Sequence, residues 1–458
     1  MEDMKNGKRS SFSGKLGYVL AAAGASVGLG NIWRFPYLAA KYGGGIFLII
    51  YIVLALTFGY TMIVAETAIG RMTRKSPVGA FKSFGKKKWL SFGGWINAVI
   101  PVLIVPYYSV IGGWVIKYLV EYFRGNAKLL AEDGYFTDFI SNGVSTELCF
   151  VAFCAFTLII IFAGVQNGIE RVSKIMMPIL IVLSVVIAVY SVTRPGALAG
   201  VKYFLVPNVK NFSWMTVVTA MGQMFYSLSI AMGILITFGS YMKKDTAIED
   251  STRNVEIFDT GIAIMAGLMI IPAVFAFSGG DPDTLQAGPS LMFITIPKVF
   301  QNMGFGTVIG IVFFVLVLFA AVTSSIALTE SAVSTFEDEL GWGRKKATVL
   351  VGVIMLALGS LSSLGYGPLA GIKIIGMQFL DLFDFLTNSV MMPIAALLTS
   401  LLVSRVVGID KIEEEIIHGE SAFKRKKVFV VMIKYLCPVF AIIILLSSVA
   451  NALGWIKM

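Results

Sequence analysis

Long apolar runs, separated by short polar connections, follow one another along the whole chain. A helix needs about 20 apolar residues to cross the hydrocarbon core of a bilayer, and eleven runs of about that length are present. They cover residues 16–40, 46–70, 91–123, 147–165, 172–192, 214–241, 257–278, 305–333, 347–364, 378–404 and 428–455. The pattern therefore predicts an all-α integral membrane protein with eleven transmembrane helices.

Two of these runs carry small and polar residues at their centres, where a plain transmembrane helix would be apolar. The first reads AAAGASVGLGNIWRFP over 21–36, and the sixth reads MGQMFYSLSIAMGILITF over 221–238. These are the opening helices of two five-helix halves, and paired interruptions of this kind indicate an inverted repeat with a binding site at mid-membrane depth. An unwound helix frees carbonyls for a cation and N–H groups for an anion. Close packing through small residues is the alternative, but it explains neither Asn31 nor the match between the halves.

The chain is expected to form one membrane domain in three parts. Residues 1–192 hold the N-terminal tail and the first five-helix repeat, 193–404 the second repeat, and 405–458 a cytoplasmic loop with the eleventh helix. The outer connection 279–303 is too apolar for a free loop, so we expect a short helix that lies on the outer face as a lid. An inert loop helix is equally compatible with this segment.

Composition and charge distribution support the membrane class. Hydrophobic residues make up 57% of the 458 residues and charged residues only 14%, beyond what soluble domains tolerate. The net charge of +10 comes from Lys and Arg in alternate connections. By the positive-inside rule, these connections and the N-terminus face the cytoplasm of a plasma (inner) membrane, and eleven crossings leave the C-terminus outside. The charge therefore indicates topology and not a nucleic-acid partner.

The chain lacks the residues that most hydrolytic or metal-dependent enzymes need. Its cysteines, Cys149, Cys154 and Cys437, lie within apolar runs, and its one histidine, His418, lies in a polar loop. Neither a zinc site nor a Ser-His-Asp triad can be assembled from these residues. We expect no enzyme activity and no organic cofactor.

Six stretches, in order along almost the whole chain, resemble the neurotransmitter:sodium symporter family and its bacterial eleven-helix members. They read GASVGLGNIWRFPYLAAKYGGGIFLIIY, VPYYSVIGGW, GVQNGIERVSKIMMP, GQMFYSLSIAMG, FAAVTSSIAL and FEDEL. The resemblance implies the leucine-transporter-type fold, a five-plus-five inverted repeat with unwound helices 1 and 6. It also implies symport of a small solute with sodium ions by alternating access.

The resemblance implies two sodium sites. The first would use Ser26, Asn31, Ser227 and Asp259 together with the substrate carboxylate, and the second would use Gly24, Val27, Ala320, Thr323 and Ser324. Oxygen ligands suit a hard cation such as Na⁺. The hydroxyls of the TSS stretch, taken alone, would more simply bond back to carbonyls of their own helix.

Asp259 departs from the pattern of many relatives. They carry asparagine there and complete the charge balance with chloride or with a glutamate one turn later, where this chain has Ala263. A carboxylate within a membrane span is costly and by default functional. We therefore predict that Asp259 binds Na⁺ and supplies the fixed negative charge, which makes transport independent of chloride. The alternative is a solvated residue at the helix end, close to Glu256.

The family's substrate pocket maps onto apolar and small polar residues. They are Ala25, Leu29, Gly30, Ile104, Tyr108, Tyr226, Ser227, Ser229, Met232, Ser324 and Leu328. Monoamine transporters of the family carry an aspartate where this chain has Gly28, so the ligand must bring its own carboxylate. Largely apolar walls favour a neutral hydrophobic or aromatic amino acid.

The resemblance also implies moving parts. The outer gate would consist of Arg34, Asp384, Tyr108 and Tyr226, and the inner gate of Arg9, Phe12, Ser240, Tyr241 and Asp338. Gly168 and Pro178 would allow the fifth helix to unwind, and Glu66 and Gln223 would form a buried network. A permanent kink is the alternative for the Gly168 to Pro178 segment. An amino acid sensor that binds without transporting is the alternative function, although both gates and the lack of a signalling domain favour transport. The sequence leaves the oligomeric state open.

Overall fold

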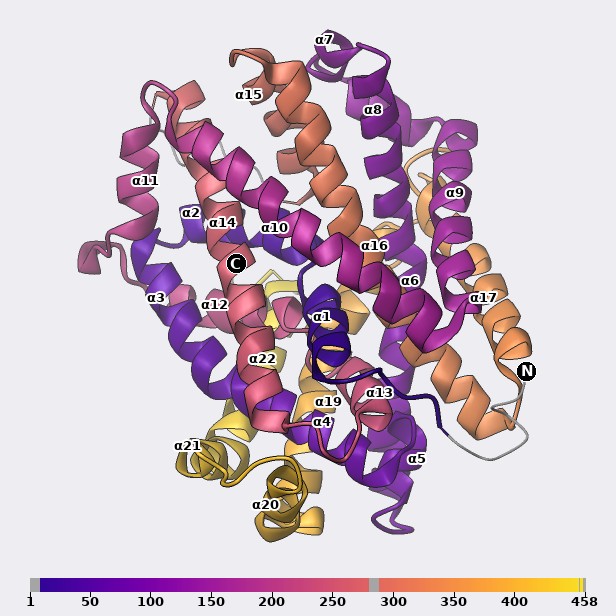
Figure 1. The fold of residues 1–458 in the computed structure, drawn as a ribbon. Coiled ribbons are helices and arrows are strands. Elements are labelled where there is room, and N and C mark those ends of the chain that lie inside the picture. The colour runs from indigo at the N-terminus through magenta and orange to yellow at the C-terminus, as the bar shows by residue number, and fades with distance from the viewer. Residues whose placement is uncertain (1–8, 280–287, 453, 456–458) are drawn as a thin grey trace.

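The computed structural model describes residues 9–279, 288–452 and 454–455, and helices dominate this part of the chain (Figure 1). Within these described residues, nine helical stretches are long and apolar enough to span a membrane. They are Gly45–Thr73 (α3, η3, α4), Lys88–Phe123 (α6), Gly143–Phe162 (α9), Val165–Val192 (η4, α10), Ile248–Ser278 (α14), Gly306–Leu340 (α16), Arg344–Leu364 (α17), Phe379–Val407 (α18, η8, α19, η9) and Lys426–Ala452 (α21, η10, α22).

Two further spans are broken, as the sequence predicts. The first consists of α1 (Lys15–Ser26) and the pair η2 and α2 (Gly30–Lys41), which meet at a bend of 53° and bring the number of spans to ten in the described residues. The sixth predicted span is α12 (Trp214–Ser227) followed by α13 (Ile234–Tyr241), each too short to cross alone. The all-helical membrane class is confirmed, while the total of eleven stays a prediction because it counts α12 and α13 as one span.

The break in the sixth span contains residues with unusual backbone angles. Ser229, Ala231 and Gly233 have φ angles of 53°, 58° and 70°. These values lie in the left-handed region, which residues other than glycine rarely adopt. Such a conformation persists only where its surroundings hold it. Here the Ala231 N–H donates to Glu66 Oε1 at 2.7 Å, and the Ser229 hydroxyl donates to the Ala25 carbonyl at 2.9 Å. Protein groups thus satisfy backbone that the bilayer cannot.

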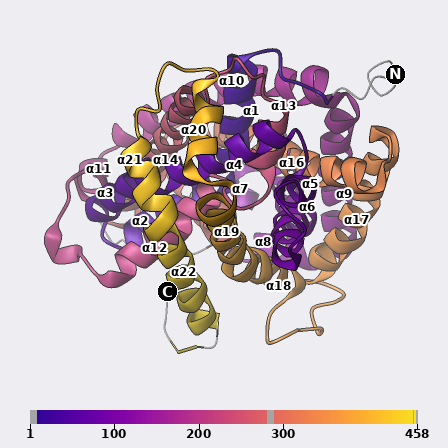
Figure 2. The same cartoon turned by 90° about the horizontal axis from the view of Figure 1, so that it is seen from below.

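The two breaks lie at the centre of the bundle. Every residue of α1 from Gly17 onward is buried, and α1 packs against α10, α14 and α16. Helices α9 and α17 pack together at one edge, and α3 and α11 (Ala197–Leu205) at the opposite edge (Figures 1 and 2). The unwound segments are therefore enclosed by protein rather than lipid.

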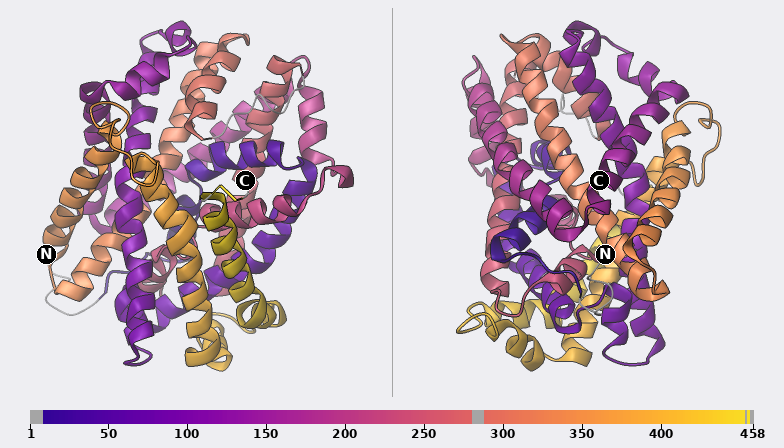
Figure 3. Two further views of the ribbon diagram at one scale, coloured as in Figure 1. Left: turned by 180° about the vertical axis from the view of Figure 1, so that it is seen from behind. Right: turned by 45° about the vertical axis from the view of Figure 1, so that its right-hand side comes forward.

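Short helices cap both ends of the bundle. At one end lie α5 (Pro77–Lys82), α20 (Ile409–Ile417) and α21, and at the other α7 (Ala127–Leu130), α8 (Tyr135–Ser141) and α15 (Ile296–Gln301), as Figures 1 and 3 show. Basic connections adjoin α5 and α21. The end of the bundle that carries α5 and α21 is thus the end that the positive-inside rule would assign to the cytoplasm.

The predicted lid segment forms a short apolar helix, Leu291–Gln301 (η7 and α15); the part of 279–303 at 280–287 lies outside the described residues. Its Phe293 packs in a cluster of aromatic rings, and the Tyr118 hydroxyl donates to the Phe293 carbonyl at 2.7 Å. The helix is therefore anchored, while its action as a lid and the three-part division of the chain stay predictions.

The loop before the last span is fixed to the bundle by a buried ion pair. Arg71, at the end of α4, is fully buried and pairs with Glu415 of α20 at 2.6 Å, and Lys244 joins the same carboxylate at 2.7 Å. Removing one partner of a buried pair is strongly destabilising, because the other charge stays buried. We conclude that α20 is an integral part of the fold.

Candidate functional site

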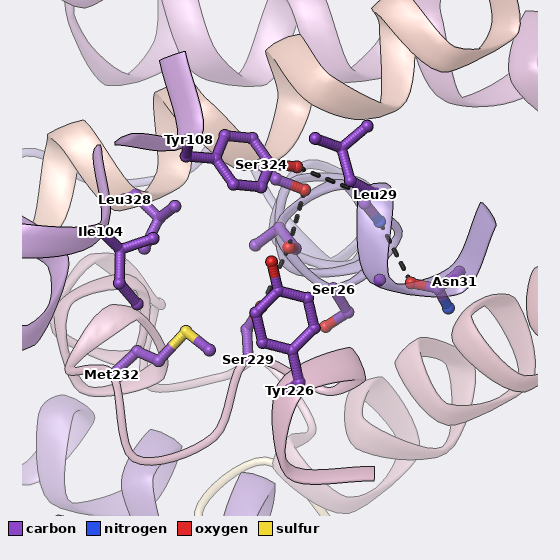
Figure 4. Close-up of a pocket in the computed structure, with 13 residues that line it drawn as sticks. Ser26, Leu29, Asn31, Ile104, Tyr108, Tyr226, Ser229, Met232, Ser324 and Leu328 are labelled. Carbon is purple, nitrogen blue, oxygen red and sulfur yellow. Dashed lines mark hydrogen bonds between the residues drawn. The ribbon is translucent and has the colours of Figure 1, made fainter. Parts of the chain in front are cut away.

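A cavity of about 20 Å³ lies where the two breaks face each other (Figure 4). Its wall consists of residues from α1, η2, α6, α12, α16 and the unwound segments: Ala25, Ser26, Gly28, Leu29, Gly30, Asn31, Ile104, Tyr108, Tyr226, Ser229, Met232, Ser324 and Leu328. All the predicted substrate residues except Ser227 are in this wall. The cavity holds only one or two water molecules, so side chains must move to admit an amino acid.

One end of the cavity is polar and the other apolar. The N–H of Leu29 donates to the Tyr108 hydroxyl at 3.3 Å, and the N–H of Gly28 to the Asn31 side-chain oxygen at 3.2 Å. Both amides lie at the start of a half-helix, which favours an anion. Figure 4 shows Ile104, Met232 and Leu328 on the side away from these amides.

Behind this polar end, three side chains bond to a buried carboxylate, that of Asp259, and form a cluster of four residues with it. Asn31 Nδ2 donates to Asp259 Oδ1 at 2.8 Å, and the Ser227 hydroxyl donates to the same oxygen at 2.9 Å. Asp259 is fully buried, so the alternative of a solvated residue at the helix end is wrong. Ser227 therefore lies in the Asp259 cluster rather than in the cavity wall. Ser26 is nearby, with its hydroxyl 3.4 Å from the Leu228 carbonyl.

Sequence reasoning missed Tyr51, the fourth member of this cluster. Its hydroxyl donates to Asp259 Oδ2 at 2.9 Å and lies 3.0 Å from the Ser227 hydroxyl oxygen. Tyr51 is the only residue with a polar side chain in the apolar stretch GIFLIIYIVLAL, which is a weak signal. A tyrosine in such a run is as often an ordinary core residue.

Tyr51→Phe is expected to lower the apparent affinity for Na⁺ about ten- to a hundredfold, because a hydrogen bond to a charged group is worth about 1.5–3 kcal/mol. The measurement is amino acid uptake as a function of Na⁺ concentration. Tyr122→Phe is the matched control, since the buried Tyr122 hydroxyl has no hydrogen-bond partner in the described residues. Equal Na⁺ affinities for the two variants would contradict a role for Tyr51 in this site.

The residues of the second predicted sodium site also lie together. The Ser324 hydroxyl is 3.2 Å from the Gly24 carbonyl and 3.3 Å from the Val27 carbonyl, at the end of α1. The Thr323 hydroxyl donates to the Ala320 carbonyl at 3.2 Å. Thr323 thus bonds to its own helix, as the alternative for TSS expects, whereas Ser324 bonds across to α1. All five groups present oxygens, the ligands that a hard cation prefers.

The five residues predicted for the inner gate are joined in one closed cluster. Arg9 pairs with Asp338 at 2.5 Å, donates to the Ser240 hydroxyl at 3.1 Å and lies over the Tyr241 ring. The Phe12 N–H donates to the Tyr241 carbonyl at 3.0 Å. Burial opposes the charge of Arg9, but Tyr241 and Asp338 outweigh it and raise its pKa. The path from the cavity to the α5 end of the bundle is therefore closed.

Three further residues extend this inner cluster. Arg9 donates to the Ser334 hydroxyl at 2.7 Å, while the Tyr241 hydroxyl and Arg344 both donate to the buried Glu330 carboxylate. Glu330 lies in the eighth apolar run, where its carboxylate was a signal that sequence reasoning could have used.

The predicted outer ion pair between Arg34 and Asp384 is not formed among the described residues, so its role as a gate stays a prediction. Arg34 lies over the Tyr226 ring, 5.3 Å from its centroid. Asp384 instead accepts hydrogen bonds from Tyr107 at 3.2 Å and from Asn388 at 2.5 Å. Arg34, Asp384 and Tyr226 all line a vestibule of about 490 Å³ above the cavity. A wide vestibule therefore lies on the outer side of the site, while the Arg9 cluster closes the inner side.

The remaining predicted residues support the two breaks in different ways. Gly168 and Pro178 lie in one continuous helix, Val165–Val192, so the predicted unwinding is not seen in this structure. Glu66 accepts from the Ala231 N–H in the second break, and Gln223 Nε2 donates to the Gly30 carbonyl at 3.0 Å in the first break. No hydrogen bond joins Glu66 to Gln223 in the described part of the chain, so the network consists of two separate supports.

Comparisons with known proteins agree with this geometry. The model of the sodium:neurotransmitter symporter family matches residues 9–133 and 137–454. The uncharacterized sodium-dependent transporter YhdH of Bacillus subtilis is 34% identical, with 97% of this chain and 99% of the relative covered. The human sodium- and chloride-dependent GABA transporter 2 is 26% identical, with 89% and 75% covered. The crystal structure of MhsT in complex with L-phenylalanine superimposes with a TM-score of 0.86 at 34% identity and covers 96% of this chain and 100% of that chain.

Proposed function

The chain belongs to the sodium:neurotransmitter symporter family, and we propose that it imports a neutral hydrophobic or aromatic amino acid together with two sodium ions, independently of chloride. It is a sodium-dependent symporter and a multi-pass membrane protein, from a family of transporters rather than enzymes. The substrate, the number of ions and the chloride independence are parts of the proposal.

The two ends of the cavity support an amino acid as the substrate. The Leu29 N–H and the Tyr108 hydroxyl suit a carboxylate, and a carboxylate there completes the oxygen shell of a cation beside Asn31. Ile104, Met232 and Leu328 suit an apolar side chain. MhsT, whose fold this chain shares, was crystallised with L-phenylalanine, an amino acid of this kind.

The single observation that carries the proposal is the buried carboxylate of Asp259 between Asn31, Ser227 and Tyr51. A buried negative charge needs a compensating positive charge, and no cationic side chain bonds to it in the described residues. A sodium ion supplies that charge. A site with its own fixed anion needs no chloride to balance the cation.

The closed inner gate and the open vestibule fit the outward-facing stage of alternating access. Substrate and ions enter past Arg34 and Tyr226, and the Arg9–Asp338 pair must then open to release them. Partly exposed ion pairs contribute about 0 to 1 kcal/mol, which suits a gate that opens in each cycle. Because the substrate carboxylate is a ligand of the first sodium ion, each ligand raises the affinity of the other.

We place the N-terminus in the cytoplasm, the C-terminus outside and the protein in the plasma (inner) membrane, in agreement with the basic connections near α5 and α21. The vestibule then opens to the outside, which is the direction that import requires.

The test is uptake of labelled L-phenylalanine by proteoliposomes. An inward Na⁺ gradient is expected to drive accumulation of the amino acid above equilibrium. Replacing Na⁺ by K⁺ is expected to abolish this accumulation, and replacing chloride by gluconate is expected to leave it unchanged. Sodium-dependent binding without accumulation would establish the sensor alternative. Loss of uptake in gluconate would contradict chloride independence alone, and competition by the other nineteen amino acids identifies the preferred side chain.

A further inference from the structure

A further cavity, of about 400 Å³, lies on the outer surface of the bundle, and its lining residues include direct sequence neighbours of Tyr51 and Asp259. It is bounded by α3 and η3 on one side, α14 on the other, and the start of α21 at one end. Figure 1 shows α3 and α14 descending toward α21. Its lining residues are Ile52, Leu56, Arg253, Glu256, Ile257, Thr260, Gly261 and Arg425.

The lining changes from charged to apolar along the groove. Arg253, Glu256 and Arg425 lie at the end near α20 and α21, while Leu56 and Ile257 are 45% and 62% exposed on the membrane-facing side. From Arg253 to Gly261 the groove follows α14 for about 12 Å. The groove is polar near the membrane surface and apolar toward the middle of the membrane, as a phospholipid is.

The charged end of the groove has both hydrogen-bond donors and a hydrogen-bond acceptor that can bind a ligand. Among the described residues Arg253 bonds only to the exposed Asp250, and Arg425 bonds to Glu256 Oε2 at 3.3 Å and lies over the Tyr60 ring. Glu256 is 2% exposed, and its Oε1 has no hydrogen-bond partner within the described residues. A buried carboxylate oxygen without a donor is costly. The two arginines can donate hydrogen bonds to a phosphate. The free oxygen of the Glu256 carboxylate can accept a hydrogen bond, and a cationic donor such as an ammonium group suits it best.

We propose that this groove binds one phosphatidylethanolamine molecule of the cytoplasmic leaflet, with its phosphate on Arg253 and Arg425, its ammonium on Glu256 and an acyl chain along Ile257 and Gly261. The charged lining residues are two arginines and one carboxylate, so a zwitterionic headgroup engages all three, whereas an anionic headgroup offers no cation to the Glu256 oxygen that lacks a partner in the described residues. A Cβ added at Gly261 meets nothing within 4 Å, so the backbone leaves room for the chain there.

The test is native mass spectrometry of the purified full chain with three lipids that have the same acyl chains. Phosphatidylethanolamine is expected to bind about tenfold more tightly than phosphatidylcholine, which has the same charges but no N–H donor, and than phosphatidylglycerol, which has no cation. Equal binding of phosphatidylethanolamine and phosphatidylcholine would overturn the proposal. Soluble phosphoethanolamine is expected not to displace the lipid; displacement at the same concentration would show a headgroup site without a lipid groove.

Two variants localise the binding. Arg253→Gln loses only an exposed ion pair and is expected to weaken phosphatidylethanolamine binding about tenfold, and Gly261→Leu is expected to abolish it by filling the groove. Arg171→Gln, an exposed arginine at the start of α10, is the control and should bind normally. Sodium-dependent amino acid binding shows that each variant is folded. Full lipid binding by Gly261→Leu would exclude this groove, whatever the transported substrate is.

Discussion

Asp259→Asn is expected to lower the apparent affinity for Na⁺ between a hundred- and a thousandfold and to reduce uptake at ordinary Na⁺ concentrations to background. The asparagine has the same shape; its one side-chain oxygen can still accept from Asn31 and Ser227, and its NH2 group can donate to the Tyr51 hydroxyl oxygen, so the fold is preserved while the charge is removed. Two unit charges about 4 Å apart at an effective dielectric constant of about 20 attract each other by about 4 kcal/mol. Since about 1.4 kcal/mol corresponds to a factor of ten, that loss gives the stated range.

The measurement is binding of labelled L-phenylalanine by purified protein as a function of Na⁺ concentration. Asp250→Asn is the matched control, because Asp250 lies on the same helix and pairs with Arg253 and Lys15 at the surface, away from the cavity. It should keep the Na⁺ dependence of the unmodified protein. If Asp259→Asn also keeps it within about twofold, the carboxylate neither binds sodium nor balances its charge, and the chloride-independent mechanism fails with it.

The two helix breaks could be predicted from the sequence because the bilayer gives a strong constraint. Freed backbone groups have no water to bond to in the hydrocarbon core, so Gly28 and Asn31 in an apolar run indicate a site rather than a defect. For Asp259, the family resemblance implied its place in the first sodium site, and the cost of a carboxylate in a membrane span supported a functional role.

Other parts of the site depend on the positions of side chains in space. Tyr51 donates to Asp259, yet its sequence context is that of a core tyrosine. Arg34 and Asp384 have the residue types of an ion pair, but whether they meet depends on the stage of the cycle, and here Asp384 is bonded to Tyr107 and Asn388. The buried pair of Arg71 and Glu415 was equally hidden, because charges in a polar connection normally indicate a solvated surface.

Gly28→Ala is expected to weaken binding of L-phenylalanine by about a hundredfold or more. A Cβ at this position would lie 2.6 Å from the Ser324 hydroxyl oxygen and 3.0 Å from the Tyr108 hydroxyl oxygen. Both hydroxyls are held in place, Ser324 by its bonds to the end of α1 and Tyr108 by the Leu29 N–H. Relieving the overlap costs about 1–3 kcal/mol, and moving Tyr108 removes a donor from the carboxylate, which adds about 1.5–3 kcal/mol.

The loss should affect substrate and sodium together, because the carboxylate joins the two. Equilibrium binding of labelled L-phenylalanine at saturating Na⁺ measures the first effect, and the Na⁺ dependence of that binding measures the second. Gly222→Ala is the matched control: it makes the same change on α12 beside the vestibule, where the new Cβ meets nothing within 4 Å. It should bind normally. Normal binding by Gly28→Ala as well would mean that the substrate carboxylate does not lie at the first break, and the link between substrate and sodium would have to be sought elsewhere in the cavity.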